Sequence, residues 1–177
     1  MEKNKTYIDK NIPIETQVQY LRDKFSCQAV RTYKFFRQEF GDRADELYER
    51  LYTMYMEDTV RDYKIDLNNI PFQAVVAMAE NEEDKSLGFQ PEIIFTSPDE
   101  VQTKFGACPY HEAAKRLNFQ EPVCTFVCVL NAKYISEHTP YHAELTARIA
   151  GGDDHCIMKI KKKEKGRQAE ASHKRKK

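Results

Sequence analysis

The sequence PEIIFTSPDEVQTKF at positions 91–105 decides the fold class that we expect for this chain. Pro91–Thr96 is rich in β-branched and aromatic residues, which is typical of a strand. The three residues after it, Ser-Pro-Asp, favour a turn. The alternating character of Glu100–Phe105 indicates a partner strand. The stretch therefore predicts an antiparallel pair of strands in the middle of the chain.

The residues before this pair are predicted to be helical. Apolar side chains recur every three to four residues over 14–40 and again over 44–60, which indicates two amphipathic helices. Gly41 marks the end of the first helix. Pro71 suits the first turn of a third helix, which we expect to end at the acidic run 80–84.

Two further helices are expected after the strand pair. Pro109 suits the first turn of a short helix over 110–117. The run 123–130 is apolar throughout, which indicates burial but does not by itself separate helix from strand. We interpret it as a helix that continues into the next residue, so that Cys124 and Cys128 share one face.

A second strand pair is predicted near the end of the chain. Short strands over 145–150 and 156–160 are joined by Gly-Gly-Asp-Asp at 151–154, which is a hairpin signal. The whole pattern predicts an α+β fold. In it, a helical N-terminal half packs on a small antiparallel sheet from the C-terminal half.

Composition and charge narrow the class of protein. Hydrophobic residues make up 41% of the 177, enough for the core of one domain, which we place at 13–161. Residues 159–177 contain ten Lys and Arg but two Glu, so this part is basic and the rest of the chain acidic, because the formal charge is zero. An acidic body gives no reason to expect specific nucleic-acid binding. We expect a flexible N-terminus at 1–12 and a disordered basic tail at 162–177.

The sequence also bears on location. No apolar stretch is long enough for a membrane span, so we expect no membrane partner. No apolar segment follows the charged start MEKNK, which argues against a signal peptide. Five cysteines without such a signal favour reduced thiols and a cytoplasmic location.

The cysteines are the most informative candidates for a functional site. Cys108 precedes a predicted helix, whose free N-terminal amides favour a thiolate, and His111 lies one turn away. Cys156 directly follows an acidic turn and a histidine. Unpaired cysteine is also commonly buried as a small apolar residue, and we interpret Cys27 and Cys124 in that way.

Two kinds of cysteine chemistry stay open. Thiolates and imidazoles bind zinc, but no Cys-x2-Cys pair is present, so we expect no cofactor and hold zinc as the alternative. A nucleophilic cysteine needs a lowered pKa and a base in reach. Asp153 and Asp154 could supply that base or could stabilise the turn. Arg148 could hold a substrate carboxylate or be an exposed strand residue.

Taken in order, these motifs resemble a known family. They are CPYHEA at 108–113, FVC at 126–128, Arg148, and GDDHC at 152–156. In this order they are similar to the L-2-amino-thiazoline-4-carboxylic acid hydrolase family. The resemblance covers about residues 15–160, and its specific part lies in the second half.

The resemblance implies an activity. The family's name-giving reaction opens a 2-aminothiazoline ring by hydrolysis and yields N-carbamoyl-cysteine. The family is also similar to small-molecule-binding domains of the 4-vinyl reductase type, which act as sensors or scaffolds. We therefore expect a hydrolase that opens a small cyclic amidine. The alternative is a non-catalytic domain of the 4-vinyl reductase type, with or without cysteine-bound metal.

The resemblance and the residue patterns together define the expected site. Expected catalytic residues are Cys108, Cys156, Cys128, Asp153, His155 and His111. Expected substrate-binding residues are Arg148, Tyr110 and Asp154. The expected partner is a small-molecule substrate or ligand, and a homo-oligomer stays open.

The sequence departs from the family pattern at two places. Ile157 and Met158 stand where the family tends to carry an aromatic residue, which affects packing more than chemistry. Cys124 is an additional cysteine. We favour Cys128 over it as the site residue because Cys128 follows the Phe-Val pair of the family motif.

Overall fold

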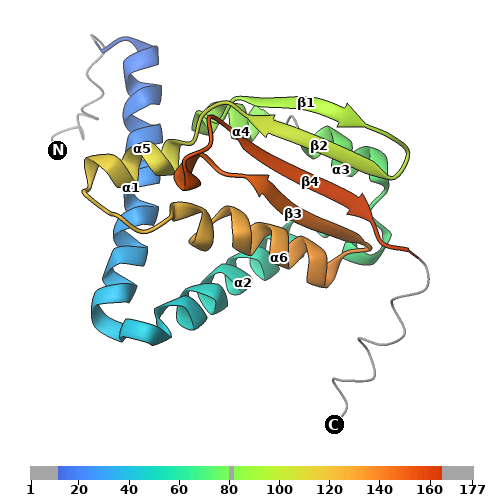
Figure 1. Ribbon diagram of the computed structural model, residues 1–177, viewed down its shortest axis with the longest axis horizontal. Coiled ribbons are helices and arrows are strands. Elements are labelled where there is room, and N and C mark those ends of the chain that lie inside the picture. The colour runs from blue at the N-terminus through green and yellow to red at the C-terminus, as the bar shows by residue number, and fades with distance from the viewer. Residues whose placement is uncertain (1–11, 80–81, 165–177) are drawn as a thin grey trace, which may run out of the picture.

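Four strands from the second half of the chain form one antiparallel sheet, and two long helices occupy the first third (Figure 1). The computed structural model describes residues 12–79 and 82–164. In chain order the elements are α1 (Ile14–Phe40), η1 (Gly41–Arg43), α2 (Ala44–Asp62), η2 (Leu67–Asn69), α3 (Phe72–Met78), α4 (Glu82–Leu87), β1 (Pro91–Thr96), β2 (Glu100–Phe105), α5 (Pro109–Arg116), η3 (Val123–Phe126), α6 (Cys128–His138), β3 (Tyr141–Ala147), η4 (Ile149–Gly151) and β4 (Cys156–Lys162).

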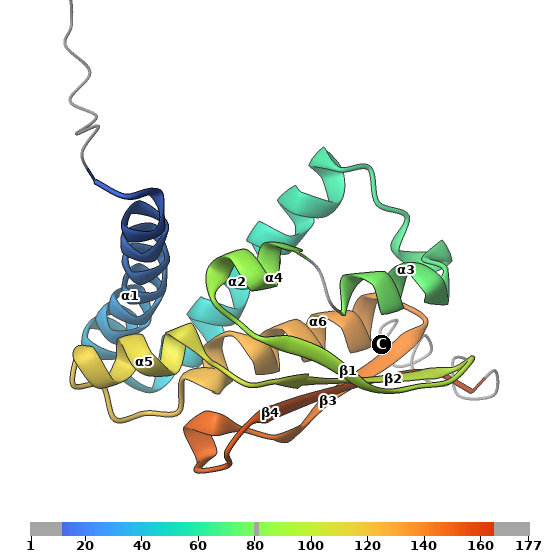
Figure 2. The ribbon, with the colours of Figure 1, turned by 90° about the horizontal axis from the view of Figure 1, so that it is seen from above.

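The sheet has the strand order β1-β2-β4-β3, so β4 lies between β2 and β3. Side chains alternate between its two faces, as strand geometry requires. The buried or half-buried face carries Val101, Thr103, Phe105, Tyr141, Ala143, Leu145, Cys156 and Met158. The opposite face is mainly polar and carries Gln102, Lys104, His142, Glu144 and Lys161, together with the apolar residues Phe95 and Ile157. The apolar face must be covered, and helices α3, α4 and α6 lie on that side of the sheet (Figure 2).

Two clusters of apolar side chains hold the helices in place. In the first cluster, Val75 of α3 packs with Val101 and Tyr141 of the sheet. The second cluster joins α1, α5 and η3, and in it the Tyr33 ring stacks on the Phe126 ring with centroids 4.2 Å apart. The second cluster fixes α1 against the segments that precede α6, and so determines where α6 begins relative to the sheet.

The predicted α+β fold, a helical N-terminal half packed on a small antiparallel sheet, is confirmed. Gly41 adopts a φ of 53°, a conformation that favours glycine and ends α1. The strand pair predicted over 91–105 is present as β1 and β2. No helix in the described ranges has the length and apolar character needed to cross a bilayer.

Several predicted boundaries were wrong. The helix predicted over 123–130 is interrupted at Val127 (φ −125°, ψ −82°), which separates η3 from α6. Cys124 and Cys128 therefore do not share a helix face. The third helix, α3, ends at Met78 just before the acidic run, as expected, but residues 82–84 of that run begin a further helix, α4, that was not expected.

The last strand pair is also shifted. β3 begins at Tyr141, four residues before the strand predicted over 145–150, because alternating burial extends back through the segment that follows α6. Of the predicted tail, residues 162–164 are described. Lys163 Nζ donates hydrogen bonds to the carbonyls of Ser136 and Thr139 at 2.6 and 2.7 Å. The rest of the tail, and the predicted N-terminal segment up to residue 11, lie outside the described residues.

Candidate functional site

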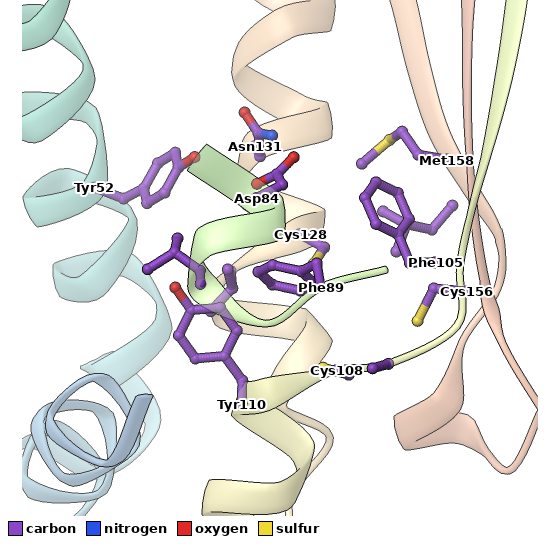
Figure 3. A pocket seen from close by; sticks show the side chains of 14 residues that line it. Tyr52, Asp84, Phe89, Phe105, Cys108, Tyr110, Cys128, Asn131, Cys156 and Met158 are labelled. Atoms are coloured by element: carbon purple, nitrogen blue, oxygen red, sulfur yellow. The ribbon is translucent and has the colours of Figure 1, made fainter. Parts of the chain in front are cut away.

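A cavity of about 150 Å³ lies between the covered face of the sheet and helices α2, α4, α5 and α6 (Figure 3). It is lined by Tyr52, Asp84, Leu87, Phe89, Phe105, Ala107, Cys108, Tyr110, Val127, Cys128, Asn131, Leu145, Cys156 and Met158. Aromatic and aliphatic side chains predominate, and a few polar groups interrupt them. An apolar cavity of this size accepts a molecule as large as benzene.

The fold brings three predicted cysteines to this cavity from three elements (Figure 3). Cys108 is the residue before α5, Cys128 is the first residue of α6, and Cys156 is the first residue of β4, opposite Phe105 of β2. Tyr110, also predicted, lines the same space. These residues are up to 48 positions apart in the sequence, and the sheet and the α6 start bring them together.

The sulfur of Cys156 accepts a backbone hydrogen bond. The backbone N–H of Ile149 donates to it at a distance of 3.2 Å. The thiol of Cys124, interpreted from the sequence as a core residue, also acts on its pKa. Hydrogen bonds to a thiolate favour the charged form, so the Cys124 contact lowers the pKa of Cys156 to about 6. The Ile149 N–H also stabilises a thiolate at Cys156, because it donates to that sulfur. The interaction with Cys156 raises the pKa of Cys124.

The loop between β3 and β4 positions the Ile149 N–H. The Asp153 carboxylate accepts a hydrogen bond from the Arg148 backbone N–H at 2.7 Å. Gly152 adopts a φ of 102°, a conformation that a residue with a Cβ rarely takes. The Asp153 carboxylate thus closes the turn one residue before the amide that contacts Cys156.

At the other two cavity cysteines, Cys108 and Cys128, burial is the largest influence and raises the pKa of the thiol. Burial raises the pKa of Cys108 to about 11, although the backbone amides of His111 and Tyr110 donate to its sulfur. Burial raises the pKa of Cys128 to about 12. Burial therefore favours the protonated thiol at Cys108 and Cys128, whereas the pKa of Cys156 is lowered.

The remaining predicted site residues lie outside the cavity lining. Asp153, Asp154 and Arg148 are exposed, and His111 and His155 are half-buried. The positive charge of Arg148 nevertheless helps to lower the pKa of Cys156 and partly opposes the rise at Cys128.

Sequence patterns did not reveal several residues of the cavity wall. Asp84 belongs to the acidic run that was expected only to end a helix, and it faces the cavity from α4 (Figure 3). Its charge raises the pKa of Cys128. Tyr52 on α2 and Asn131 on α6 add polar groups at the same end of the cavity. No local signal separates these residues from ordinary helix-surface residues, because their role depends on tertiary packing.

The donor set does not fit a bound zinc ion. Over the described residues, no three or more His, Cys, Asp or Glu side chains are arranged to hold a metal. The zinc alternative therefore has no ligand group in this part of the chain.

The sequence model of L-2-amino-thiazoline-4-carboxylic acid hydrolase matches residues 23–160. The chain belongs to this family. The match supports a hydrolase-like assignment, and it includes the cavity residues from Tyr52 to Met158. No curated protein sequence matches the chain significantly.

Two solved structures resemble this member of the hydrolase family. One is a trafficking protein particle complex subunit 3 from Naegleria fowleri covalently bound to palmitic acid. The TM-score is 0.52 and the sequence identity is 14%. The alignment covers 82% of this chain and 97% of that subunit. The other is the phenol-responsive sensory domain of the transcription activator PoxR with phenol. The TM-score is 0.53 and the sequence identity is 14%. The alignment covers 84% of this chain and 80% of that domain. At this identity the likeness shows a shared fold.

Proposed function

We propose that this protein is a hydrolase that opens a small cyclic amidine such as 2-aminothiazoline-4-carboxylate, with Cys156 as the nucleophile. The observation that carries the proposal is the environment of the Cys156 sulfur. It accepts the Ile149 N–H, its interaction with the Cys124 thiol lowers its pKa, and it lines a cavity of suitable size for one small ring.

The charge of the cavity supports an amidine substrate. The Asp84 carboxylate and the Cys156 sulfur both line it, so its polar groups favour a cation within an apolar wall. A protonated cyclic amidine has that charge. Arg148 remains our proposed partner for the substrate carboxylate, because its positive charge acts on the pKa of both Cys128 and Cys156.

The proposed reaction has two steps. The Cys156 thiolate first attacks the amidine carbon between the ring nitrogen and the ring sulfur. The ring C–S bond then breaks, the sulfur departs as a thiol after taking a proton, and an isothiourea remains on Cys156. Water next adds to the same carbon and the bond to Cys156 breaks. The oxygen stays in the urea group of N-carbamoyl-cysteine. One proton of water ends on nitrogen, and the other ends on the Cys156 sulfur, from which it returns to the group that protonated the ring sulfur.

Other residues have supporting roles in this proposal. Cys108 and Cys128 are protonated thiols facing the same cavity, so either can supply the proton to the departing sulfur. A water activated by Asp153 is the less favoured route, because that carboxylate already accepts the Arg148 N–H in the turn.

The test is turnover of 2-aminothiazoline-4-carboxylate, followed by the appearance of free thiol and by the mass of the product. We expect Cys156→Ala to lose more than about 10²-fold in kcat. Cys27→Ala is the matched control, since Cys27 lies on α1 outside the cavity lining, and it should keep wild-type activity. Full activity in Cys156→Ala would exclude a nucleophilic role for this residue.

A non-catalytic small-molecule-binding domain is the second candidate, and the apolar cavity wall favours it. The related sensory domain binds phenol, which matches a benzene-sized cavity. A long acyl chain such as palmitate exceeds this volume. This candidate predicts that phenol-sized aromatic compounds raise the Tm saturably while 2-aminothiazoline-4-carboxylate stays intact.

A further inference from the structure

The N-terminal half of α1 carries a line of exposed apolar side chains. Ile14, Val18, Leu21 and Phe25 are 70%, 38%, 61% and 50% exposed. Their spacing alternates between four and three residues, which places side chains on one face of a helix and lets two helices pack along a common seam. α1 lies at one edge of the molecule, and its first turns extend beyond α5 (Figures 1 and 2). The rest of the described chain therefore leaves these four side chains, the α1 stripe, uncovered.

A groove between α1 and α4 runs beside the stripe. Its lining includes Val18, Leu21, Arg22 and Phe25 on the α1 side and Ser86 and Leu87 on the α4 side. Arg22 Nε donates a hydrogen bond to the Ser86 carbonyl at 2.5 Å, which holds the two walls together. Leu87 also lines the cavity, and the centroid of the Phe25 ring lies 6.3 Å from that of the cavity residue Tyr110. A partner bound to the stripe would therefore adjoin the cavity wall.

We propose that the α1 stripe is the interface of a homodimer, in which α1 of a second copy packs antiparallel against it. The two-fold axis passes between the two helices near positions 19 and 20. In this register Val18 lies opposite the partner's Leu21, and Ile14 lies opposite the partner's Phe25. Every member of the stripe then has an apolar counterpart, and both copies use the same surface, as two-fold symmetry requires.

Charged side chains beside the stripe match in the same register. Glu15 follows Ile14 and Arg22 follows Leu21, so both flank the seam on one side. Antiparallel pairing sets Glu15 opposite the partner's Arg22, and the symmetry repeats the pair. Glu15 is exposed and has no ion pair within the described ranges. A parallel pair would separate the two charges by about 10 Å along the helices, so opposite charges match only in the antiparallel arrangement.

Two further observations favour a second copy as the occupant. The C-terminal half of α1 packs into the second apolar cluster through Val30 and Tyr33, so antiparallel pairing of the exposed halves leaves the two domains at opposite ends of the seam. The segment of the same chain nearest in sequence, residues 1–11, contains Met1, Tyr7 and Ile8 as its apolar residues. These three are too few to cover the stripe.

Sedimentation equilibrium of the full-length protein over a range of concentrations tests the interface. Wild type should reach twice the chain mass of 20.8 kDa. Leu21→Lys should weaken association by at least about 100-fold, because each dimer loses two buried leucines and gains two charges in the seam. Tyr20→Lys is the matched control, since Tyr20 is 64% exposed but lies outside the stripe, and it should keep the wild-type dimer.

Charge reversal tests the antiparallel register. Glu15→Arg and Arg22→Glu should each weaken the dimer by about tenfold, because two attractive pairs become two repulsive ones. The double variant should recover most of that loss. Arg22→Glu also removes the hydrogen bond to the Ser86 carbonyl, so the deciding comparison is with the double variant, which lacks the same bond. Circular dichroism verifies that each variant is folded.

Three results would overturn the proposal. One is a wild-type protein that stays monomeric up to about 0.1 mM, where even a weak dimer would be populated. If Leu21→Lys then lowered the Tm and Tyr20→Lys did not, the stripe would be covered by another segment of the same chain. The second is a dimer that Leu21→Lys leaves intact. The third is a double variant that associates no more tightly than Arg22→Glu. The readout is mass, so it does not depend on the proposed hydrolysis.

Discussion

At the scale of single residues, the cavity cysteines differ because of what their sulfurs contact. Cys108 has the helix-start amides expected from the sequence, yet burial outweighs them and the pKa of its thiol is raised. Cys156 is also 6% exposed, but it accepts a backbone amide, and the interaction with Cys124 lowers its pKa. Burial is the largest influence on the pKa of Cys108, whereas at Cys156 the interaction with Cys124 is the largest influence and outweighs burial.

The lowered pKa of Cys156 makes its reactivity depend on pH in a defined direction. The thiolate is the reactive form, so alkylation of Cys156 should be half-maximal near pH 6, approach its maximum at higher pH and fall at lower pH. Cys124→Ala removes the largest cause of the shift, so the pKa should rise towards the free-thiol value of about 8.5. At pH 7 the alkylation rate should then drop by about tenfold or more.

The measurement is the alkylation rate of Cys156 with iodoacetamide between pH 5 and pH 10, followed by peptide mass. Cys27→Ala serves as the control and should leave the profile unchanged. An identical profile in Cys124→Ala would mean that the Cys124 contact has no influence on the charge of Cys156.

At the scale of elements, the sequence predicted best those helices and strands whose signals lie within their own segment. The pair over 91–105 and the two long helices follow from periodicity and turn residues within each segment. The run 123–130 defeated the same reasoning, because its residues are apolar on every side and the break at Val127 has no Gly or Pro to mark it. The last residue of η3, Phe126, packs against Tyr33 in the second apolar cluster. The end of η3 therefore coincides with a tertiary contact and not with a local sequence signal.

The β3–β4 loop gives a prediction at this scale, because two substitutions at Asp153 separate its turn role from its charge. Asp153→Ala removes the acceptor for the Arg148 N–H. The turn should loosen, the pKa of Cys156 should rise, and the protein should lose about 1 kcal/mol of unfolding free energy. Asp153→Asn keeps an acceptor oxygen and removes the negative charge that raises the pKa of Cys156, so that pKa should fall slightly.

Urea unfolding and the pH profile of Cys156 alkylation measure these two effects. If Asp153 were instead the general base of the reaction, both variants would lose turnover alike while the Cys156 profile of Asp153→Asn stayed close to wild type.

At the scale of the whole molecule, the cavity depends on segments that lie far apart in the sequence. The family motifs located Cys108, Cys128, Cys156 and Tyr110, which the fold brings to one cavity. Asp84 was not recognised as a cavity residue, because its position is set by how α4 packs over the sheet. Sequence patterns thus identify residues with unusual chemistry, whereas residues that act by position need the tertiary arrangement.

The second apolar cluster is expected to support both stability and the site. Phe126 is 1% exposed and stacks on Tyr33 of α1, while it also ends the segment that carries Cys124. Phe126→Ala should cost about 3–5 kcal/mol of unfolding free energy, the range for a large buried ring. It should also loosen the Cys124 contact, so that the pKa of Cys156 rises in the folded variant.

Urea unfolding, with Cys156 alkylation below the transition, tests both parts. Phe35→Ala is the matched control, because Phe35 on α1 is 53% exposed, and it should change the free energy by less than about 1 kcal/mol. A folded Phe126→Ala protein that is destabilised as expected but keeps the wild-type alkylation profile would show that the cluster stabilises the fold without positioning Cys124. A loss as small as that of Phe35→Ala would instead mean that the α1–η3 contact contributes little to stability.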